Sequence, residues 1–171
     1  MGDQRNYFDL LGLPVDYKVD TQRLELNFKK LQKQFHPDRY ATATAGEQRL
    51  AMQMATLINT AYETLNSPVG RGLYLLELNG LAQEDRTLKS DPDFLFEQMA
   101  WREKLSAASS VKQMQDLLEK TDLNKEDFEA QFDQQFNAGN FLEAQQVIDK
   151  LQFVVKFRSE LLVRLSTMKN S

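Results

Sequence analysis

Apolar side chains recur at steps of three and four residues through most of this 171-residue chain. Between residues 21 and 35 this spacing places four of them on one side of a helix: Leu24, Phe28, Leu31 and Phe35. A second stripe follows a polar loop and consists of Leu50, Met54, Leu57, Ile58, Ala61 and Leu65. Two amphipathic helices joined by a loop bury their stripes by packing antiparallel. The pattern therefore predicts an all-α fold that begins with a helical hairpin.

Capping residues and prolines set the expected helix ends. Asp20 is an N-cap candidate for the first long helix, and Pro37 prevents that helix from continuing. The pair Ser67 and Pro68 starts a further short helix, because proline is favoured at the first helical position. We expect this first domain to span residues 1–79.

The second half of the chain predicts a separate helical domain. Residues 80–91, GLAQEDRTLKSD, lack a sustained stripe and indicate a linker. Three helices are expected over about 92–106, 110–137 and 140–168, with a capping box of Asn140 and Glu143 at the start of the last. The expected core stripe of this last helix is Ala144, Ile148, Leu151, Val155, Leu162 and Leu165. Residues 92–171 therefore predict a three-helix bundle.

Composition excludes several classes of site. The chain has no cysteine and one histidine, which excludes disulfides, thiolate zinc sites and cysteine nucleophiles. The N-terminus lacks the pattern of a signal peptide, and no apolar run approaches the roughly 18 residues that a membrane span needs. We therefore expect a cytoplasmic protein with no cofactor, no metal site and no membrane partner.

The distribution of charge favours an acidic partner for one local surface. The net charge is −4, and residues 91–140 hold eleven acidic and five basic side chains. Residues 21–35, by contrast, carry Arg23, Lys29, Lys30 and Lys33 with Glu25 as the only acid. The acidic remainder of the chain repels phosphate, so we expect no nucleic-acid partner. The basic surface is suited to docking an acidic protein surface.

The basic helix leads into a short segment of unusual composition, KKLQKQFHPDRYATATAG, residues 29–46. Pro37 forces a turn that presents His36 and Asp38 together at the entrance of a loop. One interpretation is a rigid recognition motif, since rigid presentation lowers the entropic cost of docking. The other is an ordinary helix end followed by a turn, in which each residue is common by itself.

The wider context resembles the J-domain of DnaJ-type co-chaperones. The resemblance rests on YFDLLGLP, the basic helix, the HPD tripeptide and a second helix carrying INTAYETLNSP, in that order. The rest of the chain lacks the glycine-rich and cysteine-rich regions of general DnaJ proteins. Three further segments, GRGLYLLELNG, DPDFLFEQMAWREKL and AQQVIDKLQFVVKFRSEL, are similar to the HscB family of J-type co-chaperones in iron–sulfur cluster biogenesis.

This resemblance implies a function, two partners and a docking site. A member of the family brings the cluster scaffold IscU to the DnaK-type chaperone HscA and stimulates the ATPase of HscA. The residues implied in chaperone binding are His36, Pro37, Asp38, Lys29, Lys30, Lys33 and Arg39. Arg39 stands where many family members have lysine, and both side chains are cations.

A second site follows from a helix with two apolar faces. At about 100° per residue, one face of the helix that starts at Pro92 carries Phe94, Trp101 and Leu105. The other face lies about 150° away and carries Leu95, Phe96, Met99 and Glu103. Phe153 and Phe157 are expected to point away from the core stripe of the last helix.

The resemblance implies that the scaffold-binding residues are Leu95, Phe96, Met99, Glu103 and Phe153. Ala100 departs from the acidic residue that is usual in the family, which removes one polar contact. Packing of the same apolar residues on the first domain stays open as the alternative.

Three classes of function are compared. A co-chaperone without catalytic activity is favoured, with a J-domain protein serving another client as the alternative within that class. An enzyme is disfavoured because one histidine and no phosphate-binding glycine loop leave only scattered carboxylates. A nucleic-acid-binding or purely structural helical protein ranks last, because no continuous basic surface is present.

Overall fold

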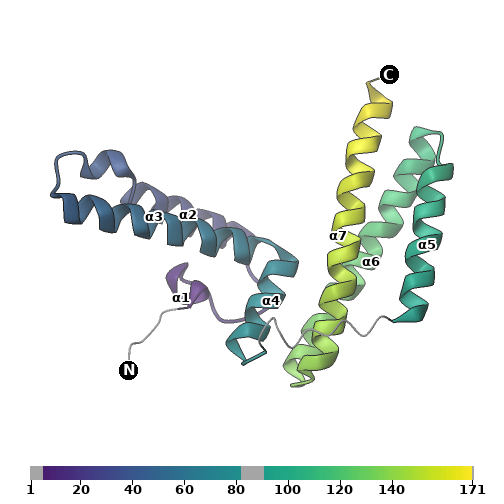
Figure 1. The fold of residues 1–171 in the computed structure, drawn as a ribbon, viewed down its shortest axis with the longest axis horizontal. Helices are drawn as coiled ribbons and strands as arrows, with labels where there is room; N and C mark the ends of the chain where they lie inside the picture. The colour runs from purple at the N-terminus through teal and green to yellow at the C-terminus, as the bar shows by residue number, and fades with distance from the viewer. Residues whose placement is uncertain (1–5, 82–90, 171) are drawn as a thin grey trace. The chain divides into compact units, whose positions relative to one another are not determined.

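The computed structural model describes residues 6–81 and 91–170, which form helices joined by turns (Figure 1). The elements are α1 (Tyr7–Leu10), α2 (Thr21–Gln34), the 3-10 helix η1 (Pro37–Tyr40), α3 (Ala45–Asn66), α4 (Pro68–Leu78), α5 (Pro92–Ala107), α6 (Val111–Asn137) and α7 (Phe141–Lys169). No strand occurs within the two described ranges, and the all-α prediction is confirmed. The chain divides into two compact units, Met1–Leu75 and Leu76–Ser171. Most of the expected linker lies outside the described residues.

The first unit is built on the hairpin of α2 and α3, which lie side by side (Figure 1). The Asp20 carboxylate accepts a hydrogen bond from the Arg23 N–H at 3.0 Å and caps α2 as predicted. Between the helices, the rings of Phe28 and Tyr62 stack with their centroids 4.0 Å apart. Both contacts fix the start and the inward face of α2.

The predicted stripe of α3 is partly wrong. Ile58, Ala61 and Leu65 are buried as predicted, whereas Leu50 and Leu57, at one edge of the stripe, are exposed. Ala51, just beyond the other edge, is buried although it was not predicted.

A buried arginine joins three segments of the first unit. Arg71 on α4 donates from Nε to the carbonyl of Leu65 at 2.9 Å and from Nη1 to the carbonyl of Tyr17 at 2.6 Å. Its guanidinium lies 5.2 Å from the centroid of the Tyr17 ring. The end of α3, the start of α4 and the loop before α2 are thereby held together.

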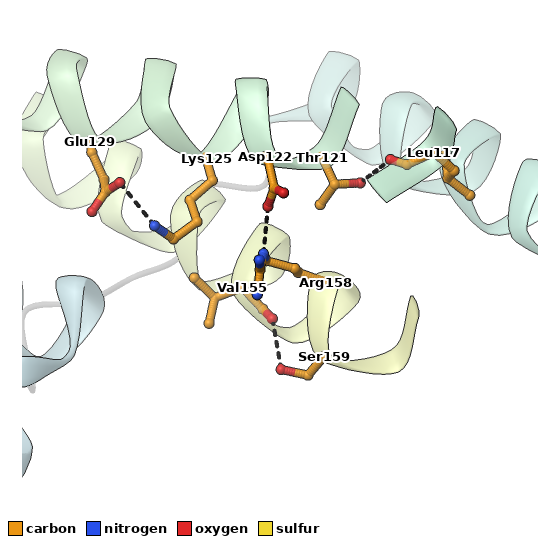
Figure 2. A network of polar contacts seen from close by, with 8 residues as sticks. All are labelled: Leu117, Thr121, Asp122, Lys125, Glu129, Val155, Arg158 and Ser159. Carbon is orange, nitrogen blue, oxygen red and sulfur yellow. Dashed lines mark hydrogen bonds and ion pairs between the residues drawn. The ribbon is translucent and has the colours of Figure 1, made fainter. Parts of the chain in front are cut away.

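The second unit is a bundle of α5, α6 and α7. One buried cluster combines residues of all three helices with Ala108: Leu105, Ala108, Met114, Leu117, Phe157, Leu161 and Leu165. Beside it, Arg158 of α7 forms an ion pair of 2.5 Å with Asp122 of α6 (Figure 2). The bonds of Thr121 to Leu117 and of Ser159 to Val155 stay within one helix each. The Asp122 pair is therefore the cross-helix polar contact of this network.

Two expectations for α7 are wrong. Asn140 is the N-cap residue but makes no side-chain capping bond, because its ψ of 68° lies outside the extended region that capping requires. Its amide instead donates to the side chain of Gln135 at 2.9 Å. Leu162 of the predicted core stripe is exposed, while Ala144, Ile148, Leu151 and Leu165 are buried as predicted.

Replacing Arg71 with methionine should destabilise the first unit alone. The variant keeps the aliphatic length but removes two charge-assisted bonds, so we expect the free energy of unfolding to fall by about 2 to 4 kcal/mol. Helix loss under urea, followed by circular dichroism, measures this change. Trp101 is the only tryptophan and lies in the second unit, so its fluorescence transition should not move. The exposed Arg49→Met change is the matched control, and equal effects of both variants would contradict the assigned role of Arg71.

Candidate functional site

The HPD turn presents its two polar side chains to solvent. Pro37 begins η1, and His36 is the N-cap residue of this short helix. His36 Nδ1 accepts a hydrogen bond from the Asp38 N–H at 3.3 Å and lies 3.6 Å from Asp38 Oδ2. These two contacts keep the His36 ring beside Asp38 within the turn. Both side chains are exposed.

Hydrogen bonds to the main chain hold the turn in place. The Gln48 amide of α3 lies within hydrogen-bond distance of three carbonyls of the loop, those of Tyr40 at 3.0 Å, Ala41 at 3.2 Å and Ala43 at 3.3 Å. At the start of α3, Thr44 and Glu47 form a capping box. The bond that the Thr44 N–H donates to the Glu47 carboxylate lowers the pKa of Glu47. Gln48 was not predicted from the sequence, because its role depends on how the loop before α3 folds back onto the first turn of that helix.

The predicted basic side chains differ in their surroundings. Lys29, Lys30 and Lys33 are all exposed on α2. Lys29 Nζ lies 2.6 Å from Glu25 Oε1, and this hydrogen bond together with the attraction of the carboxylate raises the pKa of Lys29. The positive charge of Lys29 is thus partly balanced within the helix.

A shallow hollow beside the turn collects three of the predicted chaperone-binding residues. It is lined by Gln32, Lys33, His36 and Arg39. Arg39 Nη1 lies 3.4 Å from the Lys33 carbonyl, which keeps the arginine near the end of α2. The turn and the carboxyl-terminal end of the basic helix therefore form one continuous surface.

The second candidate site lies on α5, whose two apolar faces have different environments. Phe94 and Leu105 are buried and Trp101 is half-buried. The opposite face is exposed, with relative accessibilities of 52% for Leu95, 70% for Phe96 and 60% for Met99. Glu103 is exposed as well. We call these four residues, Leu95, Phe96, Met99 and Glu103, the α5 patch.

An aromatic seam between α5 and α7 sets the orientation of the α5 patch. Phe153 is half-buried, and its ring centroid lies 5.7 Å from that of Phe94 and 5.8 Å from that of Trp101. Phe157 is fully buried and lies 5.5 Å from Trp101, so its expected outward orientation is wrong. The reason is that α7 packs on α5 as well as on α6, which gives it a second buried face.

Two ion pairs attach α5 to α7 on either side of the seam. Lys150 Nζ lies 2.8 Å from the carboxylate of Asp91, which also caps α5, and the hydrogen bond from Lys150 lowers the pKa of Asp91. Farther along, Arg102 pairs with Glu160 and lies 5.9 Å from the centroid of the Phe153 ring. Sequence reasoning missed Arg102, whose partner is 58 residues away in the chain.

Within residues 6–81 and 91–170, no group of three or more His, Cys, Asp or Glu side chains is arranged to hold a metal ion. None of the helices in these ranges is long and apolar enough to cross a membrane.

Family models match both parts of the chain. The DnaJ domain model matches residues 6–74, and the model described as HSCB C-terminal oligomerisation domain matches residues 90–162. Together with the exposed HPD turn on a helical hairpin, these matches define a J-domain co-chaperone.

Relatives that match nearly the full length of the chain show which family of J-domain co-chaperones it belongs to. A curated protein of Vibrio cholerae serotype O1 named co-chaperone protein HscB homolog is 38% identical over 161 residues, which cover 91% of this chain and 94% of the relative. The structure of chaperone HscB from Vibrio cholerae matches with a TM-score of 0.87 at 35% identity, covering 96% of this chain and 99% of that one. Human co-chaperone HscB matches with a TM-score of 0.88 at 30% identity, covering 96% and 84%. The chain belongs to the HscB family of co-chaperones.

Replacing Lys29, Lys30 and Lys33 of α2 together with glutamate should slow association with a DnaK-type chaperone. Exposed charges steer the encounter and are screened beyond about 10 Å at 0.1 M salt, so the association rate of the unaltered protein should also fall as salt rises. Stopped-flow association kinetics at several salt concentrations measure both effects.

A triple variant with the same change of net charge is the control for this prediction. Lys104, Lys112 and Lys120 are exposed in the second unit, and their reversal to glutamate should leave the association rate nearly unchanged. Association rates that are insensitive to salt would contradict electrostatic docking on α2.

Proposed function

We propose that the chain brings the iron–sulfur cluster scaffold IscU to the DnaK-type chaperone HscA, stimulates the ATPase of HscA and so assists cluster maturation and transfer. The observation that carries this proposal is the presence of two accessible surfaces of different chemistry on two separate units. One surface is basic and ends in the HPD turn, and the other is the apolar α5 patch. A protein that joins two partners needs two such surfaces.

Binding to HscA takes place in two steps in this proposal: electrostatic attraction comes first, and docking of the HPD turn follows. The lysines of α2 attract an acidic surface of HscA over several ångströms, and the HPD turn then docks. Asp38 accepts a charge-assisted hydrogen bond from a cation of HscA, a bond worth about 1.5 to 3 kcal/mol. Gln48 keeps the turn in one conformation, so little conformational entropy is lost when it docks.

On the scaffold side, the α5 patch supplies apolar anchors. Leu95, Phe96 and Met99 lose water-exposed surface on binding, while Glu103 gives a polar contact at the edge. Phe153 extends this surface through the part of its ring that the seam leaves accessible. The seam and the two ion pairs hold α5 so that its anchors face outward before the scaffold arrives.

The proposed role is that of an adaptor without a reaction of its own. In this proposal, HscA binds and hydrolyses the ATP. The curated relatives are named co-chaperones. Incubating the purified chain with ATP in the absence of any chaperone tests this point, since hydrolysis by the chain alone would require another function.

One observation favours a second candidate, a J-domain co-chaperone that serves another client. Ala100 stands beside the α5 patch where an acidic residue is usual in the family. A client with fewer basic side chains at its contact surface fits this more apolar environment. Competition between IscU and proteins captured by the full-length chain separates the two candidates, because a different client would not be displaced by IscU.

Replacing His36 with glutamine should abolish ATPase stimulation and leave folding and scaffold binding intact. The imidazole is exposed, so its replacement leaves no void in the core. Steady-state ATPase rates of HscA with the variant, together with its thermal melting curve and its affinity for IscU, measure the three properties. A variant that stimulates as well as the unaltered protein would refute the proposed use of the HPD turn.

Replacing Leu95, Phe96 and Met99 together with alanine should separate stability from scaffold binding. These side chains are exposed, so the bundle should keep most of its stability, whereas a buried large-to-alanine change costs about 2 to 5 kcal/mol. Affinity for IscU should fall at least tenfold, which requires a loss of only about 1.4 kcal/mol. Basal stimulation of HscA should persist, because the HPD turn is unchanged.

The matched comparison is Trp101→Ala on the buried face of α5. This variant removes a ring that contacts both Phe153 and Phe157, so we expect it to destabilise the bundle severely. Denaturation midpoints by circular dichroism and titration with IscU compare the two variants. Equal loss of stability in both would mean that the α5 patch is core and that the scaffold binds elsewhere.

A further inference from the structure

Leu26 stands alone among cations on the outer face of α2. It is 55% exposed, and the residues at positions −3, +3, +4 and +7 from it are Arg23, Lys29, Lys30 and Lys33. These spacings place all four side chains around the leucine on one side of the helix. Glu25, which pairs with Lys29, is the one acidic side chain of α2, so Leu26 lies within a surface of net positive charge.

The fold of the first unit does not account for this leucine. The inward stripe of α2 begins at Leu24, and Leu26 lies about 200° from it on a helix that turns about 100° per residue. A polar residue at this position would serve the hairpin equally well, because the side chain does not enter the core. Isolated exposed leucines are common on protein surfaces, but this one coincides with a docking surface.

We propose that Leu26 is the central apolar contact of the chaperone-docking surface, and that HscA offers it an apolar depression bordered by acidic side chains. This inference rests on the proposed function. Two observations support the choice of occupant: the cations around Leu26 complement acidic side chains, and the surface continues into the hollow at Lys33, His36 and Arg39. A basic or uncharged partner surface would not complement the four cations around Leu26.

The exposed charges and the apolar side chain of Leu26 affect different rates of binding. Exposed charges raise the association rate and set its salt dependence, but each contributes little to affinity. An apolar side chain enclosed by polar neighbours becomes fully desolvated in a complex and slows dissociation. In the proposed complex, the aliphatic stems of the neighbouring lysines cover the edge of this contact.

The test compares two substitutions at this position in the full-length chain. Leu26→Ala removes the apolar contact and keeps the charges, so affinity for HscA should fall about fivefold through faster dissociation, with unchanged salt dependence of association. Leu26→Lys completes a surface of cations, so association should be as fast as before or faster while dissociation accelerates. Association and dissociation rates with HscA, measured at two salt concentrations, and the HscA concentration for half-maximal ATPase stimulation give the result.

Met52→Ala is the matched control, because Met52 is 63% exposed on α3 and has no ring of cations around it. It should bind and stimulate like the unaltered protein. Melting curves should be equal for all three variants, since alanine and lysine both favour an exposed helical position.

The outcomes separate this inference from the proposed function. If Leu26→Ala dissociates no faster than Met52→Ala while His36→Gln abolishes stimulation, the role of Leu26 is wrong and the proposed function stands. If Leu26→Lys binds more tightly than the unaltered protein, docking is electrostatic alone and the inference is overturned. If His36→Gln still stimulates fully, the proposed function itself fails.

Discussion

In each unit, one helix carries a candidate binding surface, α2 in the first unit and α5 in the second. The side of that helix that packs in the core decides which side chains face solvent. In α2, the packing of Phe28 on Tyr62 turns the lysines and Leu26 outward. In α5, the packing of Phe94 and Trp101 on Phe153 turns the α5 patch outward. Side chains on opposite sides of a helix cannot both pack on the same neighbouring helix, so the side away from the neighbour faces solvent. The two binding surfaces are therefore consequences of core packing as much as of their own residues.

The two surfaces are held by different kinds of interaction. Backbone hydrogen bonds from Gln48 and the Thr44 capping box fix the HPD turn, which suits a short motif whose shape is recognised. The α5 patch depends on its helix as a rigid body, and aromatic burial is the larger stabilising contribution there. Pairs of aromatic rings add about 0.5 to 1.5 kcal/mol beyond their buried area, whereas exposed ion pairs contribute about 0 to 1 kcal/mol. Arg102 and Lys150 therefore fix the register of α5 more than its stability.

Sequence patterns were sufficient where the determining interaction is local. Asp20, Pro37 and Pro68 act through residues within one helical turn, and the helix ends that they mark match the structure: α2 starts after Asp20 and ends before Pro37, and α4 starts at Pro68. The two faces of α5 could likewise be derived from residue spacing, because the exposed and buried residues follow helical periodicity. Leu26 could also have been found this way, since it lies opposite Leu24.

Errors arose where the conformation of a connection or a contact from another helix decides the environment of a side chain. Phe157 is buried because α7 meets α5 as well as α6, and spacing along α7 alone gives no information about a second neighbour. Asn140 fails as a side-chain cap because the tight connection at Gly139, where φ is +78°, sets its backbone conformation. Gln48 and Arg102 act on partners that become neighbours only in the folded chain. In each case, residue type was compatible with several environments and tertiary packing selected one.

An adaptor with two separate binding surfaces forms a ternary complex because both surfaces belong to one chain, more than because either surface binds strongly. The chaperone-docking residues and the α5 patch share no side chain and lie in different units, so substitutions in one should not alter the intrinsic affinity of the other. When both partners are bound, the covalent connection between the units holds each partner near the other at a higher effective concentration than in solution. Two moderate affinities then suffice for a ternary complex, and each partner can still leave when the other has acted. Weak exposed contacts, such as paired lysines and a single leucine, are therefore suited to a protein that must release what it delivers.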